Sequence, residues 1–219
     1  MEAVAELLKT DGWFAGLASD QQAMLTAALR ERPFEKGEHV YRIGDAPDGL
    51  WVVLAGEVRL VSYSAAGEEA VGLILRPGRW FGELSVLDEG PRPHDAVTLR
   101  RSGLGFLPMA TLADLALRNP QLWRSLAILT CRHHRRTLAR LERTLFQSAR
   151  TRLASLLGAA LDTTNPSAPI HINQTELANT VGVSRQRLNR LLAELRAKGI
   201  VQTSYGAVIV LEPQRLAEL

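Results

Sequence analysis

The sequence predicts an α+β fold, in which a β-rich N-terminal half is followed by a long helix and a small C-terminal domain of helices and a β-hairpin. Three observations predict it. First, 11 of the 17 glycines fall between Gly37 and Gly105. Second, residues 121–146 contain no glycine or proline. Third, two short helical patterns joined by a glycine turn precede two β-rich segments near the C-terminus.

The N-terminal half begins with short amphipathic helices over residues 2–30, around the segment DGWFAGL. Between about residues 33 and 108 the pattern changes to short β-rich segments punctuated by glycine. Regularly spaced short strands with turn residues are typical of a β-barrel or sandwich rather than of βαβ units. The expected strands are HVYRI, LWVVLAG, EVRLVSY, AVGLIL, AVTLR and GLGFLP.

A short helix, TLADLALRNP, follows Pro108, and Pro120 suits the first turn of the long helix that we expect over 121–146. Positions in this helix recur at alternating steps of three and four, which is typical of a coiled coil. They can form either a dimer seam or the face that packs on the helix's own domain. We favour the seam, because so long and arginine-rich a helix cannot bury both sides in one small domain. The seam residues expected are Leu122, Leu126, Leu129, His133, Thr137 and Leu141.

The C-terminal part predicts a winged helix-turn-helix. A helix over about 148–162 leads into the loop DTTNPSAP. Asn173 can cap the next helix, with Glu176 as its capping-box partner. Gly182 can adopt a positive φ and end that helix, and Ser184 can cap the following one. Gly199 ends this second helix, and the segments IVQT and AVIVL form a two-stranded wing around SYG.

The second helix of this motif has a polar face that suits DNA. Leu188, Leu191, Leu192 and Leu195 gather on one side, whereas the charged residues within 177–193 are all arginine. Arginine can pair with guanine, and glutamine or asparagine with adenine, at base edges in the major groove. An ordinary solvated helix would mix acidic and basic residues, so we favour DNA contact. The expected contact residues are Ser184, Arg185, Gln186, Arg187, Asn189 and Arg190.

Charge is distributed unevenly along the chain. Residues 1–110 hold 11 Lys/Arg against 16 Asp/Glu, whereas residues 111–219 hold 15 against 7. A basic C-terminal half indicates a polyanionic partner, although a solvated basic helix face would give the same balance.

Other classes of protein are disfavoured. The single cysteine, Cys131, excludes an intrachain disulfide and a four-cysteine metal or iron–sulfur site. No apolar run is long enough for a membrane span, and the acidic start does not resemble a secretory signal, so we expect a cytoplasmic protein with no membrane partner. We find no GxSxG, HExxH, CxxC or P-loop motif, and we expect no enzyme.

The segment VGVSRQRLNRLL resembles the turn and recognition helix of the cyclic-AMP receptor protein/FNR (Crp/Fnr) superfamily of bacterial transcription regulators, and the resemblance extends over almost the whole chain. It implies a cyclic-nucleotide-binding-type, jelly-roll-like β-roll with flanking helices over 1–119. It further implies a dimerisation helix over 120–147 and a winged helix-turn-helix over 148–219. The implied partners are a second copy of the chain, a palindromic DNA operator and RNA polymerase. The family usually has glutamate at the position of Gln186, so a different half-site is expected.

The segment RWFGELSVLDEGPRPHDAVTL resembles the family's phosphate-binding cassette. The backbone at Gly82, Glu83, Leu84 and Ser85 would hold a phosphate, and Glu83 would accept from a ribose hydroxyl. Pro93 and His94 stand where an adjacent arginine and serine are usual, and Arg92 lies one residue early. In the long helix, Thr137 matches a purine-contacting threonine, with Leu138 in place of a serine.

The resemblance therefore leaves the effector open. A cyclic nucleotide is one candidate. Haem is a weaker one, because His94 lies near the position of a haem-ligating histidine in carbon-monoxide sensors of the family. The cysteines that hold the iron–sulfur cluster of the FNR branch are absent. A regulator that needs no effector is the remaining alternative.

Overall fold

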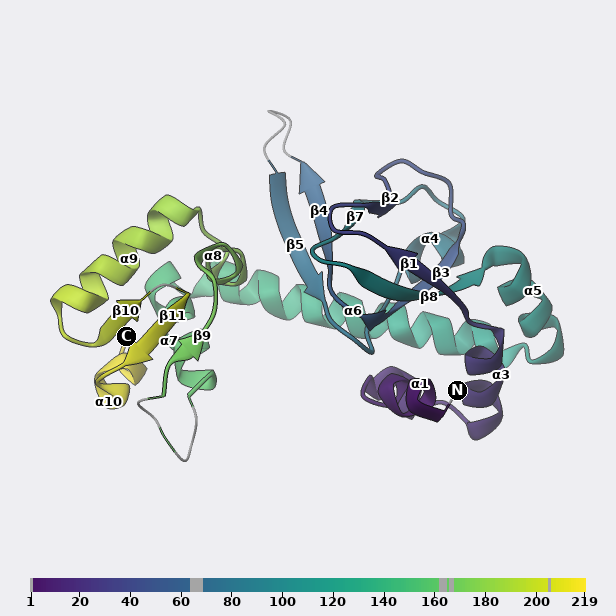
Figure 1. Ribbon diagram of the computed structural model, residues 1–219, viewed down its shortest axis with the longest axis horizontal. Coiled ribbons are helices and arrows are strands. Elements are labelled where there is room, and N and C mark those ends of the chain that lie inside the picture. Colours follow the sequence, from purple (N-terminus) through teal and green to yellow (C-terminus); the bar gives the residue numbers. More distant parts are fainter. Residues whose placement is uncertain (1, 64–68, 162–164, 166–167, 205) are drawn as a thin grey trace. The chain divides into compact units, whose positions relative to one another are not determined.

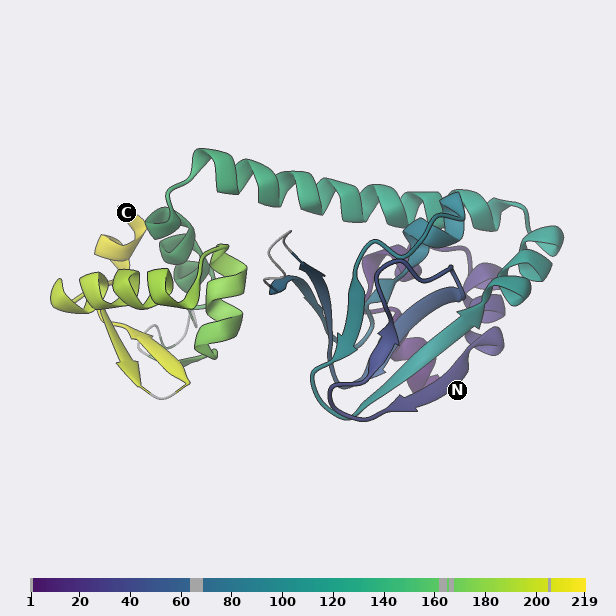
Figure 2. The same cartoon turned by 90° about the horizontal axis from the view of Figure 1, so that it is seen from above.

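The computed structural model describes residues 2–63, 69–161, 165, 168–204 and 206–219. It divides the chain into two compact units, which we call the N-terminal unit (Met1–Arg135) and the C-terminal unit (Arg136–Leu219). The boundary lies inside the long helix α6 (Gln121–Phe146), which is continuous in Figures 1 and 2. The two halves of this helix therefore pack within different units. No helix among the described residues is long and apolar enough to cross a membrane.

The β-rich region of the N-terminal unit forms two four-stranded antiparallel sheets, as the strand spacing predicted. One sheet has the order β1-β8-β3-β6 and the other the order β2-β7-β4-β5. The first contains β1 (Arg30–Phe34), β8 (Ser102–Pro108), β3 (Gly49–Ala55) and β6 (Trp80–Phe81). The second contains β2 (His39–Tyr41), β7 (Asp95–Thr98), β4 (Val58–Tyr63) and β5 (Glu69–Leu75). Their buried side chains form one cluster that includes Tyr41, Trp51, Val53, Val58, Phe81, Leu104 and Phe106.

Two of these strands were not predicted from the sequence. Strand β1 reads RERPF, so its charges and its proline hide the β pattern. It lies at the edge of its sheet, where a proline is tolerated because only one side of the strand needs hydrogen bonds. Strand β6 has only two residues, which is too short for a periodicity.

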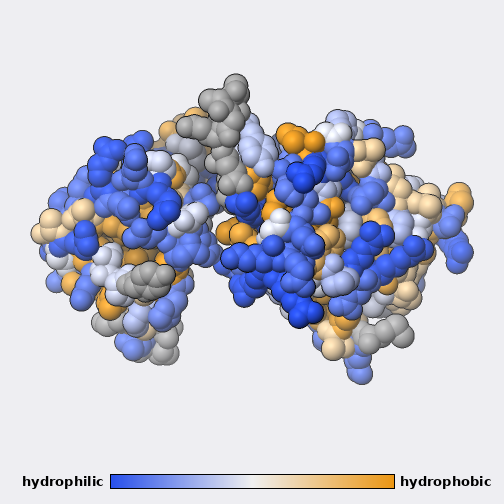
Figure 3. All heavy atoms as spheres, turned by 45° about the horizontal axis from the view of Figure 1, so that its top comes forward, coloured by the Kyte–Doolittle hydropathy of each residue, from blue (hydrophilic) through white to orange (hydrophobic). Residues whose placement is uncertain are grey.

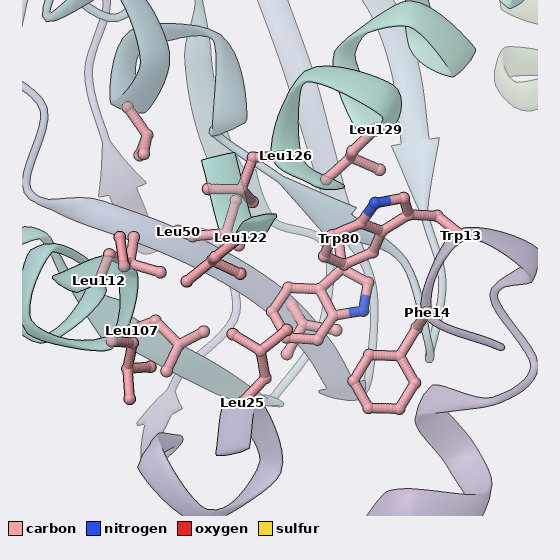
Figure 4. Close-up of a cluster of buried hydrophobic side chains, with 14 of the residues drawn as sticks. Trp13, Phe14, Leu25, Leu50, Trp80, Leu107, Leu112, Leu122, Leu126 and Leu129 are labelled. Carbon is pink, nitrogen blue, oxygen red and sulfur yellow. The ribbon is translucent and has the colours of Figure 1, made fainter. Parts of the chain in front are cut away.

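Helices pack against the first sheet to form a second core. They are α1 (Glu2–Leu8), α2 (Gly12–Ala15), α3 (Ser19–Ala28), α5 (Met109–Arg118) and the first half of α6, while α4 (Glu83–Asp88) follows β6. Figure 4 shows the aromatic centre of this core. The Phe14 ring stacks on the Trp80 ring, and the Trp13 ring packs edge-on against Trp80. The Trp13 indole N–H donates to the carbonyl of Ser125, which ties α2 to α6.

The structure corrects the predicted seam of the long helix. Leu122, Leu126 and Leu129 are at most 1% exposed and point into this core (Figure 4). They pack against the N-terminal helices and the sheet of the same chain, so they cannot face a partner. The alternative interpretation, a helix lying on its own domain, was the right one for these three residues.

The C-terminal unit has the predicted helix-turn-helix. Its elements are α7 (Ala149–Ala159), α8 (Gln174–Val181), α9 (Arg185–Ala197) and α10 (Pro213–Ala217), with the strands β9 (Ile170–His171), β10 (Val201–Ser204) and β11 (Ala207–Val210). Asn173 caps α8 by accepting from the Glu176 amide, and Ser184 caps α9 by accepting from the Arg187 amide. Gly182 has a positive φ, as expected, and Gly199, which was expected to end the second helix, also has a positive φ.

The wing has three strands, in the order β10-β11-β9, rather than the predicted two. Strand β9, which pairs with β11, has only two residues, and this is too short for a periodic pattern to predict. Helix α10 was likewise not predicted. Most of the predicted loop 162–169, and Tyr205 in the predicted turn SYG, lie outside the described residues.

Candidate nucleic-acid interface and effector site

Helix α9 has one face in the core of the C-terminal unit. Leu188, Leu192 and Leu195 are at most 3% exposed, and they pack with α7, α8 and the wing strands. Leu191, the fourth predicted leucine, is only partly buried. Burial of three leucines fixes the rotation of the helix, because the opposite arc must then face solvent.

The opposite arc carries Gln186, Asn189 and Arg190, while Arg185 and Arg187 flank it and Ser184 caps the helix. All of them are exposed, and they lie at the first two turns of α9 or at its cap. Glu194, in the third turn, is the first acidic residue of the helix, and it pairs with Arg150 of α7. The exposed side chains at the start of α9 are therefore three arginines, two side-chain amides and the capping hydroxyl of Ser184. They are Arg185, Arg187 and Arg190, with Gln186 and Asn189.

A groove of about 700 Å³ runs along one side of α9. Arg187 and Arg190 line it from α9, and the start of α7 lines it from the other side at Ser148 and Arg150. The Ser148 hydroxyl caps α7 by accepting from the Thr151 amide. In Figure 3, hydrophilic residues dominate the visible face of the C-terminal unit. Besides three arginines and the positive end of α7, the groove is lined by Glu194, which pairs with Arg150, and by the apolar Leu191 and Leu219.

The cassette lies in the N-terminal unit, where β6 leads into α4. Gly82 has a φ of 87°, in the left-handed region, and Glu83, Leu84 and Ser85 form the first turn of α4. Glu83 and Ser85 are buried, whereas Leu84 is exposed. The Ser85 hydroxyl donates to the carbonyl of Pro91, which closes the loop after the helix.

Arg92 reaches back into the cassette although it lies one residue early in the sequence. Its side chain is buried, and its guanidinium donates to the Gly82 carbonyl at 2.8 Å and to the Gly49 carbonyl at 2.7 Å. It also pairs with Asp48. A Cβ at position 82 would lie 2.7 Å from Arg92 Nη1, so this close approach requires glycine. The sequence suggested that a small adjustment of the loop could bring Arg92 into place, but it did not indicate the contacts with Gly49 and Asp48.

An unsatisfied polar cluster surrounds Arg92. The guanidinium lies 4.3 Å from the centre of the Tyr41 ring, and the His94 ring stacks on the same tyrosine. Among the described residues, Arg92 Nε, the Tyr41 hydroxyl and His94 Nδ1 are buried without a hydrogen-bond partner. Burial raises the pKa of Tyr41 and lowers the pKa of His94, so both side chains favour the neutral form. Buried polar atoms without partners are where a water or a ligand is expected.

Glu83 contacts the long helix through a pair that the sequence did not indicate. Its carboxylate lies 2.8 Å from His133 Nδ1 of α6, within the N-terminal unit. This placement corrects the predicted seam role of His133, because its ring points at the cassette of its own chain. The two residues are 50 positions apart, and no local pattern relates them.

The remaining predicted residues lie on the second half of α6, in the C-terminal unit. Thr137, Leu138 and Leu141 are exposed there, and their roles stay predictions. No group of three or more His, Cys, Asp or Glu suited to a metal ion occurs in the described part of the chain.

Comparisons with known proteins match both units. Residues 31–119 match the cyclic nucleotide-binding domain family, and residues 135–219 match the Crp-like helix-turn-helix domain family. The chain is 32% identical to the cyclic AMP receptor protein of Thermus thermophilus over 97% of its own length and 98% of that protein. The chain belongs to the Crp/Fnr superfamily.

Further relatives agree with this assignment. A protein of Mycobacterium tuberculosis described as a CRP-like cAMP-activated global transcriptional regulator is 28% identical over 97% of each chain. The crystal structure of the Thermus thermophilus catabolite activator protein superposes with a TM-score of 0.55 at 32% identity, covering 95% of this chain and 97% of that one. This Crp/Fnr chain is therefore a transcription regulator with a cyclic-nucleotide-binding-type domain and a helix-turn-helix domain.

Proposed function

We propose that this Crp/Fnr protein is a homodimeric regulator that binds a palindromic DNA operator through α9, with an affinity set by a small effector in the N-terminal unit. The observation that carries the proposal is the exposed start of α9, which holds three arginines and two amides and no acidic side chain. In a helix-turn-helix protein the start of the second helix enters the major groove.

The polar face divides into two roles. Arg185, Gln186, Asn189 and Arg190 supply side chains that can pair with base edges, guanine for arginine and adenine for the amides. Arg187 and Ser148, which line the groove beside α9, suit the DNA backbone. Phosphate contacts orient the protein, whereas base contacts select the sequence.

A dimer requires a different face of α6 from the one predicted. A helix turns about 100° per residue, and a stripe of exposed positions with steps of three and four lies within an arc of about 80°. This arc is offset by roughly a third of a turn from the three buried leucines. Four of its members are large and more than a third exposed, and Leu141 retains its predicted place. The stripe consists of Trp123, Ala127, Cys131, His134, Leu138, Leu141 and Leu145. We propose it as the dimer seam.

A cyclic nucleotide is the effector class that we propose. Two relatives are named for cyclic AMP, and the cassette offers a buried cation, Arg92, with a free Nε beside Gly82 and Glu83. Arg92 would neutralise the phosphate, and Glu83 would accept from the ribose hydroxyl. Because Glu83 already contacts His133, a bound nucleotide would act directly on the helix that continues into the C-terminal unit.

The test of DNA contact is a fluorescence-anisotropy titration with a duplex that the protein selects from a random library. Arg185→Ala and Arg190→Ala should each cost about 1–3 kcal/mol of specific binding. Arg215→Ala, which removes an exposed arginine from α10, is the matched control and should bind like the wild type. Unchanged affinity in both α9 variants would contradict the assignment.

A further inference from the structure

Arg152 joins the ends of two helices in the C-terminal unit. This residue of α7 donates from Nε to the carbonyl of Val181, the last residue of α8, at 2.8 Å. From Nη1 it donates to the carbonyl of Gln147 at 2.6 Å and to that of Thr144 at 3.3 Å, at the end of α6. The last carbonyls of a helix lack partners within the helix and carry its negative dipole end, so a guanidinium suits both ends at once.

A second arginine makes a parallel link. Arg140 of α6 donates from Nη2 to the carbonyl of Asn179 in the last turn of α8, at 2.9 Å. Two arginines on different helices thus hold the same end of α8. Guanidinium groups stay charged at any working pH and hold their donors in a rigid plane, which makes these links directional.

The end of α8 determines where the recognition helix begins. Only the turn Gly182–Ser184 separates Val181 from Arg185, the first residue of α9. Fixing the end of α8 to the end of α6 therefore fixes the start of α9 relative to α6. This relation holds within one compact unit, because residues 136–219 include all the groups concerned.

We propose that Arg152 and Arg140 are positioning residues that set the spacing of the operator half-sites. The inference rests on the proposed dimer. If α6 pairs with the α6 of a second copy, the relative position of these two helices is fixed. Because the links fix each α9 to its own α6, the relative position of the two recognition helices is then fixed as well. The pair would then accept one separation and one relative rotation of the half-sites. Looser links would leave each half-site contact intact and widen the accepted range of spacings.

The experiment compares operators of different spacing. The duplexes are the palindrome that the wild type selects, the same half-sites moved apart or together by one base pair, and an isolated half-site. One base pair changes the separation by about 3.4 Å and the rotation by about 34°. We expect the wild type to bind the altered duplexes about tenfold more weakly than the selected one, and Arg152→Ala to reduce that ratio to about threefold or less.

Controls separate positioning from folding. Arg152→Lys keeps the charge but not the planar donors, so its ratio should fall between those of the wild type and Arg152→Ala. Arg140→Ala should also lower the ratio of the affinity for the selected duplex to that for the altered duplexes. If Arg152→Ala unfolds at a lower temperature than the wild type, Arg140→Ala replaces it as the test variant. Arg215→Ala should keep the wild-type ratio. Affinity for the isolated half-site should stay within about twofold in every variant that melts like the wild type.

Two results would overturn the inference. In the first, the variants keep the wild-type ratio between spacings. In the second, the ratio falls only in variants whose affinity for the isolated half-site also drops well beyond twofold, so that the change reflects lost folding and not altered spacing. A wild-type protein that binds none of the duplexes would instead contradict the proposed function itself, and the inference with it.

Discussion

Gln186 stands at a proposed DNA-contact position where the resemblance to the Crp/Fnr superfamily implies a glutamate. Its side chain is exposed in the first turn of α9. Glutamine can pair with adenine N6 and N7, whereas glutamate can only accept, as from cytosine N4. Gln186→Glu should therefore replace adenine by cytosine at one position of each half-site. Selection from a random library with each protein measures this, and an identical motif from both would show that Gln186 does not read a base.

His94 makes the stability of the N-terminal unit depend on pH. Burial lowers its pKa, so the folded chain holds it neutral while the unfolded chain takes up a proton near pH 6.5. The stabilisation is present above that pH and is lost as the pH falls toward the folded pKa. The slope is at most about 1.4 kcal/mol per pH unit for one proton.

His94→Gln, which is neutral at any pH, should lose less stability than the wild type between pH 7.5 and pH 5.5. Urea unfolding followed by tryptophan fluorescence measures it, because Trp13 and Trp80 lie in the core of this unit. Parallel losses in the two proteins would mean that His94 is protonated equally in the folded and unfolded chains.

The long helix α6 has one face buried in the N-terminal core and another, exposed face that we propose as the dimer seam. Leu126 is fully buried in the N-terminal core, and Leu141 is about half exposed on the proposed seam. Leu126→Ala should lower the free energy of unfolding by about 2–5 kcal/mol, because it leaves a cavity. Leu141→Glu should leave this core intact and shift the dimer toward monomer in sedimentation velocity. A Leu141→Glu protein that stays dimeric at the same concentration would place the seam elsewhere.

Local patterns predicted the boundaries of the helix-turn-helix and the exposure of the polar side chains at the start of α9. The boundaries of α8 and α9 followed from Asn173, Gly182 and Ser184, whose caps and turn act over three or four residues. Which face of α6 is buried could not be predicted in this way. Leucines occur on two faces of the helix, and the buried face is decided by α2, α3 and β6, which are far away in the sequence.

The candidate effector site shows the same limit. The glycine and the first turn of α4 were predicted from their own segment. The contacts of Arg92 with Gly49 and Asp48, and that of Glu83 with His133, join residues 40 to 50 positions apart. Such contacts depend on the closure of the β-roll and on how α6 lies against it. Neither can be predicted from a local sequence pattern.

In the whole molecule, effector binding in the N-terminal unit and operator binding in the C-terminal unit should be thermodynamically coupled. If cyclic AMP strengthens operator binding by some factor, the operator must strengthen cyclic AMP binding by the same factor. Calorimetry of cyclic AMP binding with and without the operator measures this. Arg92→Ala should weaken cyclic AMP by about one to two decades, since a charge-assisted hydrogen bond is lost. Tight binding that the mutation leaves unchanged would place the phosphate elsewhere.

We propose above that this Crp/Fnr protein reads DNA as a dimer through the start of α9. Selection from a random-sequence duplex library, with purified protein in the presence of cyclic AMP, tests it most directly. The structure predicts enrichment of a palindrome whose half-sites lie about one helical turn apart, each containing guanine and adenine positions. Arg185→Ala and Arg190→Ala should lose this enrichment. A library that stays random, or a motif without two-fold symmetry, would contradict the account.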